Sequence, residues 1–290
     1  MVVCSLLTTS HVCTKKELKQ VLKNLEDFGF NKIEDLNSKD SFLNHWGGSP
    51  KERTQNLYSA WNSNSDAIIC FKGGSGISHF LPLVNIKKMK GKKLFVGYSD
   101  ITLLLNFLQK KKKIITFHGP NGLSKFDKQT SSSLKKALNM ETYGISFEKE
   151  KCFNIPKNNL KGKTIGGNLE RLVETLFYTK LNFKNKILFL EEVGHTEYKI
   201  FNLLMFLKTY QKGFKPKAIL FGNLGIKNKK LMTKLIKEIF PDIPLITNLP
   251  FGHQIPKITI PIGANCEIDF KKEKIKFSFT RKHKKYAIKI

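Results

Sequence analysis

Cysteine is scarce in this chain, and its distribution argues against two kinds of small scaffold. The 290 residues contain five cysteines, which are scattered along the chain, and no two of them have the Cys-x-x-Cys spacing. The sequence therefore disfavours both a zinc ribbon and a disulfide framework. The cysteines are Cys4, Cys13, Cys70, Cys152 and Cys266. Cys4 and Cys70 lie within apolar runs, where a thiol usually serves as a small core residue.

Long apolar runs are absent as well. No uninterrupted apolar stretch reaches the roughly 20 residues that a membrane-spanning helix needs. Residues 1–7 lack a cationic beginning and are too short for a secretory signal, so they are better interpreted as a first core strand. We therefore expect a cytoplasmic protein without a membrane partner. A chain of this length can bury a substantial core in one large domain or two smaller ones.

Arginine is rare although the chain is strongly basic. The formal net charge is +28, but only three of the 51 basic residues are arginines, Arg53, Arg171 and Arg281. Sites that recognise bases or grip phosphates favour arginine over lysine. The lysines are spread along the whole chain, which is typical of a general lysine bias. We therefore expect no specific nucleic-acid partner, while weak attraction to anionic surfaces or substrates stays open.

The first half of the chain contains an alternation of strand and helix patterns. Two capping boxes, at 14–17 and 49–52, each predict the start of a helix, and Gly29 marks the end of the first one. Continuous apolar runs predict strands buried on both faces. The expected strands are 2–7, 67–71, 93–96 and 114–117. Such alternation predicts parallel βαβ units, whose ligands bind beyond the carboxyl ends of the strands.

The pattern changes after a polar stretch near the middle of the chain. We expect a linker over 141–160, between an N-terminal domain of residues 1–140 and a C-terminal domain of residues 161–290. Expected helices are 169–177 and 198–209, and expected strands are 186–190, 218–221, 244–247, 258–262, 266–270, 275–279 and 286–290. The expected fold class is α/β, with an N-terminal parallel-sheet domain of flavodoxin-like type and a smaller, β-rich, mixed C-terminal domain.

A candidate nucleophile follows the strand at 93–96. The segment 95–100 (FVGYSD) passes from apolar residues directly into a helix pattern, which predicts a strand, a sharp turn and a helix. A serine on such a turn projects its hydroxyl from the end of the sheet, beside unpaired N–H groups of the helix start. This is the geometry of a nucleophile elbow, although Ile101 replaces the last glycine of Gly-x-Ser-x-Gly. The alternative is that Ser99 or Asp100 only caps the helix.

A glycine-rich turn, 72–76 (KGGSG), follows the strand at 67–71. It lacks the Gly-Lys-Ser/Thr ending of a phosphate loop, and His79 stands where a dinucleotide fingerprint needs its third glycine. Another molecule can still approach the backbone N–H groups of such a turn closely. The segment is therefore either an anion cradle or simply a tight turn.

Carboxylate and imidazole candidates follow two later strands. The strand at 186–190 runs into Glu191 and Glu192, and strand alternation turns one of the two inward, where a carboxylate needs a partner. The alternative is that both are solvated. His253 follows the strand at 244–247 in a rigid Pro-Phe-Gly-His turn, and His118, at another strand end, is its rival. Ser99, Glu191 and His253 occur in the Ser…Glu…His order of the α/β-hydrolase triad.

In a triad of these three residues, each side chain would have a separate role in the reaction. Ser99 would attack a carbonyl, His253 would accept and return its proton, and Glu191 would fix the imidazole tautomer and stabilise the imidazolium. Backbone N–H groups of Gly74 and Asp100 are the expected oxyanion donors. The expected oxyanion and substrate-binding residues are Gly73, Gly74, Ser75 and Asp100.

Motifs along nearly the whole chain resemble the serine L,D-carboxypeptidases, the family of muramoyltetrapeptide carboxypeptidase and the microcin C self-immunity hydrolase. The matching segments are 67–76 (AIICFKGGSG), 97–102 (GYSDIT), 118–120 (HGP), 167–169 (GNL), 188–193 (LFLEEV) and 250–253 (PFGH) with 261–263 (PIG). The resemblance implies a parallel-sheet N-terminal domain, a smaller β-rich C-terminal domain and a site at their junction. It also implies Ser99 as nucleophile, Glu191 and His253 as its partners, and a structural or substrate-lining role for His118.

Several positions depart from the family pattern. Lys72 stands where arginine is usual, Ser75 replaces a tyrosine and His79 replaces an arginine. Phe201 and Asn202 replace an Asp-Arg pair, which removes an ion pair. These changes leave the triad whole but border the expected pocket, so they bear on the substrate more than on the reaction.

The expected function is a serine hydrolase without metal or cofactor that releases the terminal D-alanine of murein tetrapeptide during recycling of cell-wall peptides. The altered pocket keeps a second hydrolase open, one that cleaves an amide in a peptide–nucleotide antibiotic of the microcin C type. Two further alternatives are a lysine-rich nucleic-acid-binding protein on a hydrolase scaffold and a weak paralogue that only binds peptides. Since relatives often pair, the resemblance also allows a homodimer.

Overall fold

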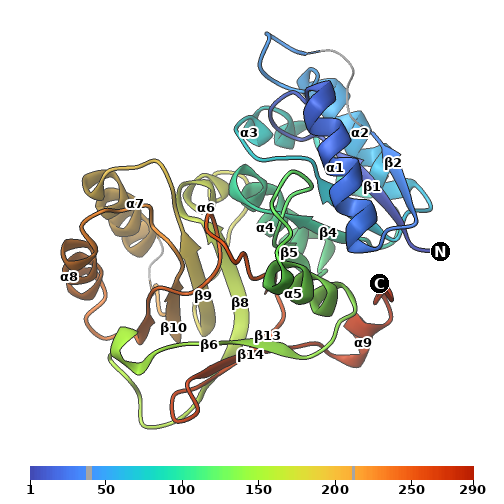
Figure 1. Ribbon diagram of the computed structural model, residues 1–290. Helices are drawn as coiled ribbons and strands as arrows, with labels where there is room; N and C mark the ends of the chain where they lie inside the picture. The colour runs from blue at the N-terminus through green and yellow to red at the C-terminus, as the bar shows by residue number, and fades with distance from the viewer. Residues whose placement is uncertain (37–40, 211–212) are drawn as a thin grey trace.

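The computed structural model describes residues 1–36, 41–210 and 213–290, and it folds them around two β-sheets (Figure 1). The strands of the first sheet are β1 (Val3–Leu7), β2 (Lys32–Asp35), β3 (Ala67–Cys70), β4 (Leu94–Gly97), β5 (Thr116–His118) and β12 (Ile260–Ile262). The helices associated with it are α1 (Lys15–Phe28), α2 (Pro50–Asn62), α3 (Ile77–Phe80), α4 (Thr102–Lys112) and α5 (Lys128–Leu138).

The first sheet has the strand order β12-β5-β4-β3-β1-β2. Strands β1 to β5 are parallel, and their order 2-1-3-4-5 is that of flavodoxin-like folds, so the predicted N-terminal architecture is confirmed. Strand β12 comes from the second half of the chain and pairs antiparallel with β5, with Ile260 opposite His118. The carboxyl ends of β3, β4 and β5 therefore share one edge of the sheet, where a ligand site is expected.

Local sequence signals explain where the first helices begin. Before α1, the hydroxyl of Thr14 accepts a hydrogen bond from the backbone N–H of Glu17, and the Glu17 carboxylate accepts one from the backbone N–H of Thr14. Ser49 and Glu52 form the same reciprocal cap before α2. Gly29, with a φ of +122°, ends α1. Both predicted capping boxes are confirmed.

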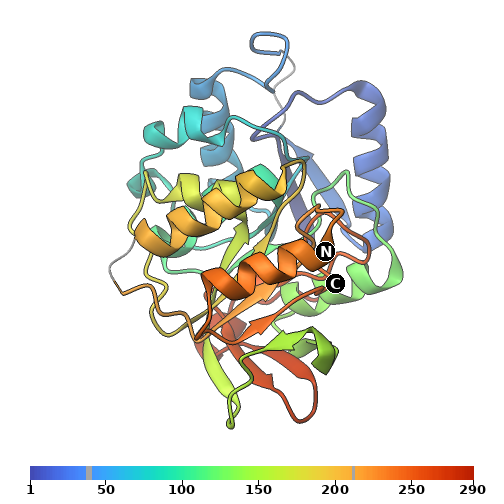
Figure 2. The same ribbon diagram turned by 90° about the vertical axis from the view of Figure 1, so that its left-hand side faces the viewer.

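The second sheet is mixed, with the order β6-β14-β13-β8-β9-β10-β11-β7. Its strands are β6 (Tyr143–Ser146), β7 (Cys152–Phe153), β8 (Leu160–Asn168), β9 (Lys186–Glu191), β10 (Ala218–Phe221), β11 (Leu245–Ile246), β13 (Asn265–Asp269) and β14 (Lys274–Ser278). Helices α6 (Leu169–Thr175), α7 (Glu197–Tyr210) and α8 (Lys229–Ile239) lie in front of it in Figure 2. The expected linker 141–160 contains β6 and β7, which form the two edges of this sheet; the proposed domain boundaries stay a prediction.

The two sheets meet where α4 packs against α6 (Figure 1). The side-chain amide of Asn106 donates to the backbone oxygen of Gly166 at 2.9 Å, and the backbone N–H of Asn168 donates to the Thr102 hydroxyl at 3.0 Å. Gly167 has a φ of +140°, and a Cβ there would lie 2.5 Å from Cγ2 of Thr102. Glycine is therefore required at this junction.

The C-terminal end differs from the prediction. Residues 286–290 form no strand; the chain instead makes the short helix α9 (Arg281–Lys284), which Thr280 caps, and then an irregular tail. The backbone N–H of Ile288 donates to the oxygen of Leu138, and that of Ile290 donates to the Asn139 side chain. The apolar tail thus packs at the end of α5, because the sheet edge nearest to it in sequence is already taken by β6.

No helix in residues 1–36, 41–210 or 213–290 combines the length and apolar character that crossing a membrane requires.

Candidate active site

Ser99 lies on a sharp turn between β4 and α4. Its φ is +64°, in the left-handed region that residues with side chains seldom occupy. Residues Ser99–Ile101 form a 3₁₀ turn before the α-helix begins. The turn is tight because Gly97 has no side chain: a Cβ on Gly97 would lie 2.7 Å from Cγ2 of Ile101. Backbone strain of this kind clusters at functional sites, and here it holds the serine at the carboxyl end of the sheet.

Glu191 and His253 form a close pair. Nδ1 of His253 lies 2.7 Å from Oε2 of Glu191, whose side chain is fully buried, whereas the His253 ring is partly exposed. The carboxylate can only accept, so it fixes the proton on Nδ1 and leaves Nε2 of His253 as the free ring nitrogen. Although burial raises the pKa of Glu191, the nearby His118 ring and the hydrogen bond from His253 outweigh it and lower the pKa to about 2. Glu191 is therefore ionised at neutral pH.

The approach of the His253 loop to Glu191 depends on Gly252. This glycine has a φ of +91°, and a Cβ there would lie 2.6 Å from Oε2 of Glu191. A larger residue would push the loop away from the carboxylate, so the Gly-His sequence is a geometric requirement of the pair.

His118 contacts the same carboxylate from its other side. Nε2 of His118 lies 3.5 Å from Oε1 of Glu191, and the ring is 1% exposed. Burial lowers the pKa of His118, although Glu191 opposes the shift, so the ring is neutral at neutral pH. This burial favours the structural role of the two roles that the resemblance allowed for His118.

The turn that contains Ser99 lies beside the loop of His253 through Tyr98. The ring centroids of Tyr98 and His253 are 4.9 Å apart, so the residue next to Ser99 packs directly against the imidazole. Within the described residues no hydrogen bond joins the Ser99 hydroxyl to the His253 ring. Contacts of this kind commonly become short only when substrate binds.

The glycine-rich turn lies on the other side of Ser99. A Cβ on Gly73 would lie 3.0 Å from Cβ of Ser99, so the backbone of this turn touches the serine. Gly74 has a φ of +134°, and a Cβ there would lie 2.5 Å from the His11 ring. The hydroxyl of Ser75 lies 3.3 Å from Nε2 of His11. The structure therefore brings the predicted oxyanion segment to the nucleophile.

The side chain of Asp100 makes structural contacts, whereas its backbone N–H is the expected oxyanion donor. Its carboxylate is buried and accepts hydrogen bonds from the Ser10 hydroxyl at 2.7 Å and from the backbone N–H of Ile77 at 3.3 Å. Burial raises the pKa of Asp100, while the hydrogen bond from Ser10 and the charge of Arg171 oppose the rise. Asp100 thus ties the start of α3, and with it the glycine-rich turn, to the nucleophile turn.

Models of known protein families match both halves of this chain. Residues 3–119 match the LD-carboxypeptidase N-terminal domain, and residues 161–268 match the LD-carboxypeptidase C-terminal domain. A putative carboxypeptidase of Rickettsia conorii is 32% identical over 241 residues, which cover 78% of this chain and 75% of the relative.

The chain belongs to the LD-carboxypeptidase family.

Two further relatives also match over most of their own length. A probable murein peptide carboxypeptidase of Bacillus subtilis is 27% identical over 274 residues, covering 88% of this chain and 84% of the relative. The microcin C7 self-immunity protein of Escherichia coli is 24% identical over 269 residues, covering 79% and 78%.

Two solved structures share the fold. The apo microcin C7 self-immunity protein superposes with a TM-score of 0.83 at 22% identity and covers 99% of this chain and 97% of its own. Muramoyltetrapeptide carboxypeptidase from Oxalobacter formigenes gives a TM-score of 0.81 at 21% identity, covering 95% and 98%. The predicted family and fold class are both confirmed.

Glu191 and Glu192 are both buried, which contradicts the alternative of two solvated groups. Glu192 accepts hydrogen bonds from the side-chain amide of Asn168 at 2.8 Å and from the backbone N–H of Glu170 at 2.9 Å. Its contacts are thus with the start of α6, whereas Glu191 faces the two histidines.

The positions that depart from the family pattern have ordinary partners. Nζ of Lys72 lies 2.7 Å from Oε1 of Glu17, and the rings of His79 and Trp46 have centroids 4.7 Å apart. Phe201 packs against the core around α7, and Asn202 is exposed on the same helix. Ser75 belongs to the glycine-rich turn and His79 to α3, which follows it, whereas Phe201 and Asn202 lie on α7.

Two residues that support the site were missed in the sequence. Arg53 is fully buried and donates to the backbone oxygens of Thr9 at 2.9 Å and Gly76 at 2.8 Å, so it holds the end of the glycine-rich turn. Its rarity as one of three arginines could have identified it. Lys257 is buried beside His253, and among so many lysines the sequence contains no signal that marks it.

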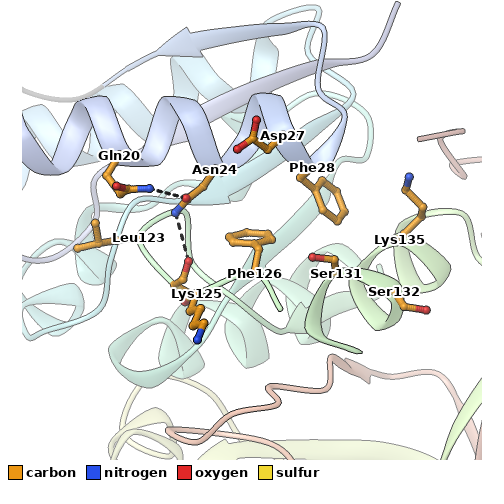
Figure 3. A pocket seen from close by; sticks show the side chains of 11 residues that line it. Gln20, Asn24, Asp27, Phe28, Leu123, Lys125, Phe126, Ser131, Ser132 and Lys135 are labelled. Atoms are coloured by element: carbon orange, nitrogen blue, oxygen red, sulfur yellow. Dashed lines mark hydrogen bonds between the residues drawn. The ribbon is translucent and has the colours of Figure 1, made fainter. Parts of the chain in front are cut away.

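A cavity of about 740 Å³ lies apart from this site, between α1 and α5 (Figure 3). Within it, the side-chain amide of Asn24 donates to the backbone oxygens of Gly122 at 2.9 Å and Ser124 at 3.2 Å. Phe28 and Phe126 form its apolar side, with ring centroids 5.6 Å apart. None of the triad candidates lines this cavity. In the described residues, no group of three or more His, Cys, Asp or Glu side chains is arranged to hold a metal ion.

Proposed function

We propose that this LD-carboxypeptidase family member is a serine hydrolase in which Ser99, His253 and Glu191 act as a catalytic triad. The observation that carries the proposal is the 2.7 Å contact between Nδ1 of His253 and the buried Glu191 carboxylate, beside a serine held in a left-handed turn. A buried, ionised carboxylate that orients an imidazole is the element that distinguishes a triad from a capping serine.

The residues divide the reaction as follows. Oγ of Ser99 attacks the substrate carbonyl while Nε2 of His253 accepts its proton, and Glu191 stabilises the imidazolium that forms. The backbone N–H groups of Gly74 and Asp100 stabilise the developing oxyanion. His253 then returns the proton to the leaving amine, and water releases the acyl group by the same steps in reverse order.

The proposed substrate is murein tetrapeptide, from which the enzyme releases the terminal D-alanine. Support comes from the relatives, which include a probable murein peptide carboxypeptidase and a muramoyltetrapeptide carboxypeptidase. The proposed role is the recycling of cell-wall peptides in the cytoplasm.

Replacing Ser99 with Ala tests the proposal. We expect D-alanine release from a murein tetrapeptide to fall by roughly a thousandfold or more, because the nucleophile is lost while the oxyanion donors remain. The control is Ser132→Ala, an exposed serine on α5, which should keep wild-type activity. Near-wild-type release by the Ser99 variant would remove this residue from the mechanism.

A second candidate is the hydrolysis of an amide in a peptide–nucleotide of the microcin C type. The self-immunity protein is a relative over most of both chains, and Ser75 and His79 depart from the usual family pattern in and just after the glycine-rich turn. Assay of the wild type against both substrate classes decides between the candidates through the ratio of their kcat/KM values.

A further inference from the structure

Lys257 is a buried lysine that forms no ion pair within the described residues. It is 6% exposed and lies in the loop between His253 and β12. Its Nζ donates a hydrogen bond to the backbone oxygen of Gly252 and lies 3.9 Å from the centre of the Tyr98 ring. Burying an ammonium without a carboxylate partner is costly, and here a carbonyl and an aromatic face compensate it. Its contacts therefore indicate what the cation holds together.

The two groups that Lys257 contacts are the immediate neighbours of the proposed base and nucleophile. Gly252 precedes His253, and Tyr98 precedes Ser99. The Tyr98 ring also packs against the His253 ring, with centroids 4.9 Å apart. The backbone N–H of Lys257 donates to the Thr130 hydroxyl on α5 at 2.8 Å, which anchors the lysine itself. One ammonium thus connects the turn after β4 with the loop after β11.

We infer that Lys257 is a positioning residue: its ammonium holds the turn of Tyr98 and Ser99 against the loop of Gly252 and His253, and so sets the distance between nucleophile and base. The inference rests on the proposed triad. The groups that Lys257 contacts are Gly252, Tyr98 and Thr130, so its role is to position the reacting residues rather than to react. Misplacement of reacting groups by about 1 Å can cost on the order of a hundredfold in rate, so such a brace has a measurable effect.

The charge of Lys257 makes the brace sensitive to pH. The titratable groups around it are Glu191, His118, His253 and Tyr98. Burial lowers the pKa of Lys257 to about 8, with the charge of Glu191 opposing the shift. Burial also raises the pKa of Tyr98, so its phenol stays neutral in this range. The ammonium is present below about pH 8 and is lost above it, and the reactivity of Ser99 should fall with it.

A fluorophosphonate serine probe tests the inference without a choice of substrate. The rate of Ser99 labelling is measured in the full-length wild type and in Lys257→Met, Lys257→Arg and Lys93→Met. Lys93 is the control, because it is partly buried and, like Lys257, donates to a backbone oxygen, that of Ser63 at 2.7 Å, but lies before β4 at the end of the strand opposite Ser99. Thermal unfolding of each variant verifies the fold.

We expect Lys257→Met to label about a hundredfold more slowly than wild type at pH 7, and Lys93→Met to label at the wild-type rate. Lys257→Arg should restore labelling to within about tenfold and keep it constant to pH 9.5, because arginine does not lose its proton. With the tetrapeptide, the loss should appear in kcat rather than in KM.

Labelling of folded Lys257→Met at the wild-type rate would overturn the inference and leave the triad standing. A wild type that is not labelled at Ser99 would contradict the proposed triad, and with it the inference. If Lys257→Met does not fold, the wild-type profile decides: a fall in labelling through about pH 8 supports the inference, and a constant rate from pH 7.5 to about pH 9.5, well past that pKa, overturns it.

Discussion

At the scale of single residues, Glu191 is the central group of the site, because its carboxylate faces two imidazoles. Oε2 contacts His253 and Oε1 lies near His118, so each oxygen of the carboxylate has its own ring. His118 occupies the oxygen that His253 does not use. It thereby limits rotation of the carboxylate and keeps Oε2 directed at the base.

The pKa of Glu191 predicts a dependence of stability on acid. Against the effect of burial, which raises it, the contacts with His118 and His253 lower this pKa from an ordinary value of 4.5 to about 2 in the folded protein. A carboxyl with a depressed pKa stabilises the fold above its unfolded pKa, and this contribution is lost as the pH falls toward the folded pKa. The contribution is on the order of 3 kcal/mol at neutral pH.

Urea unfolding of the wild type and of Glu191→Gln between pH 5 and pH 2 measures this contribution. The free energy of unfolding of the wild type should decrease more steeply with acid than that of the variant, which has no carboxyl to titrate. Parallel curves for the two proteins would contradict the proposed environment of Glu191.

At the scale of elements, the site depends on loops that approach one another without side chains between them. Gly252 is the clearest case, because a Cβ there would lie 2.6 Å from Glu191. Replacing Gly252 with Ala should lower kcat by about a hundredfold and destabilise the fold by about 1–3 kcal/mol. Assays of kcat and thermal unfolding measure both effects.

Gly194 provides the matched control for this substitution. It also has a positive φ, +81°, but no atom lies within 4 Å of the position that a Cβ would take. Gly194→Ala should therefore show only the backbone strain, about 1 kcal/mol, with unchanged kcat. Equal losses of kcat in both variants would show that the approach of the loop to Glu191 is not what matters.

Elements with a local cause could be predicted from the sequence. The capping boxes set the starts of α1 and α2, and continuous apolar runs identified β3 and β4. The strand at 286–290 was wrong because alternation alone does not supply a partner strand. Lys257 and Arg53 could not be predicted, since their roles arise from contacts between residues far apart in the chain.

The three triad candidates could be predicted from the sequence for a different reason. Ser99 and His253 follow the carboxyl ends of β4 and β11, Glu191 is the last residue of β9, and their order along the chain is that of a known triad. The order of residues along the chain does not give the distance in space between side chains on different sheets. The structure brings Glu191 and His253 together. The hydrogen bond from Asn168 to Glu192 shows that this second carboxylate faces α6 instead.

At the scale of the whole molecule, the net charge of +28 is the most unusual property. If it reflects only a lysine-rich composition, double-stranded DNA should bind weakly and lose that binding at about 100 mM salt, since contacts between lysine and phosphate are strongly screened. Fluorescence anisotropy of a labelled duplex across a salt series measures this. Tight binding that persists above this salt concentration would favour the nucleic-acid alternative.

Ser99 and His253 are proposed to act as one unit, and the kcat values of Ser99→Ala, His253→Ala and the double variant on murein tetrapeptide measure this coupling. Residues of a triad are strongly non-additive, because loss of one disables the others. We predict that the double variant is about as slow as Ser99→Ala alone. A double variant slower by the product of the two single losses would contradict the claim.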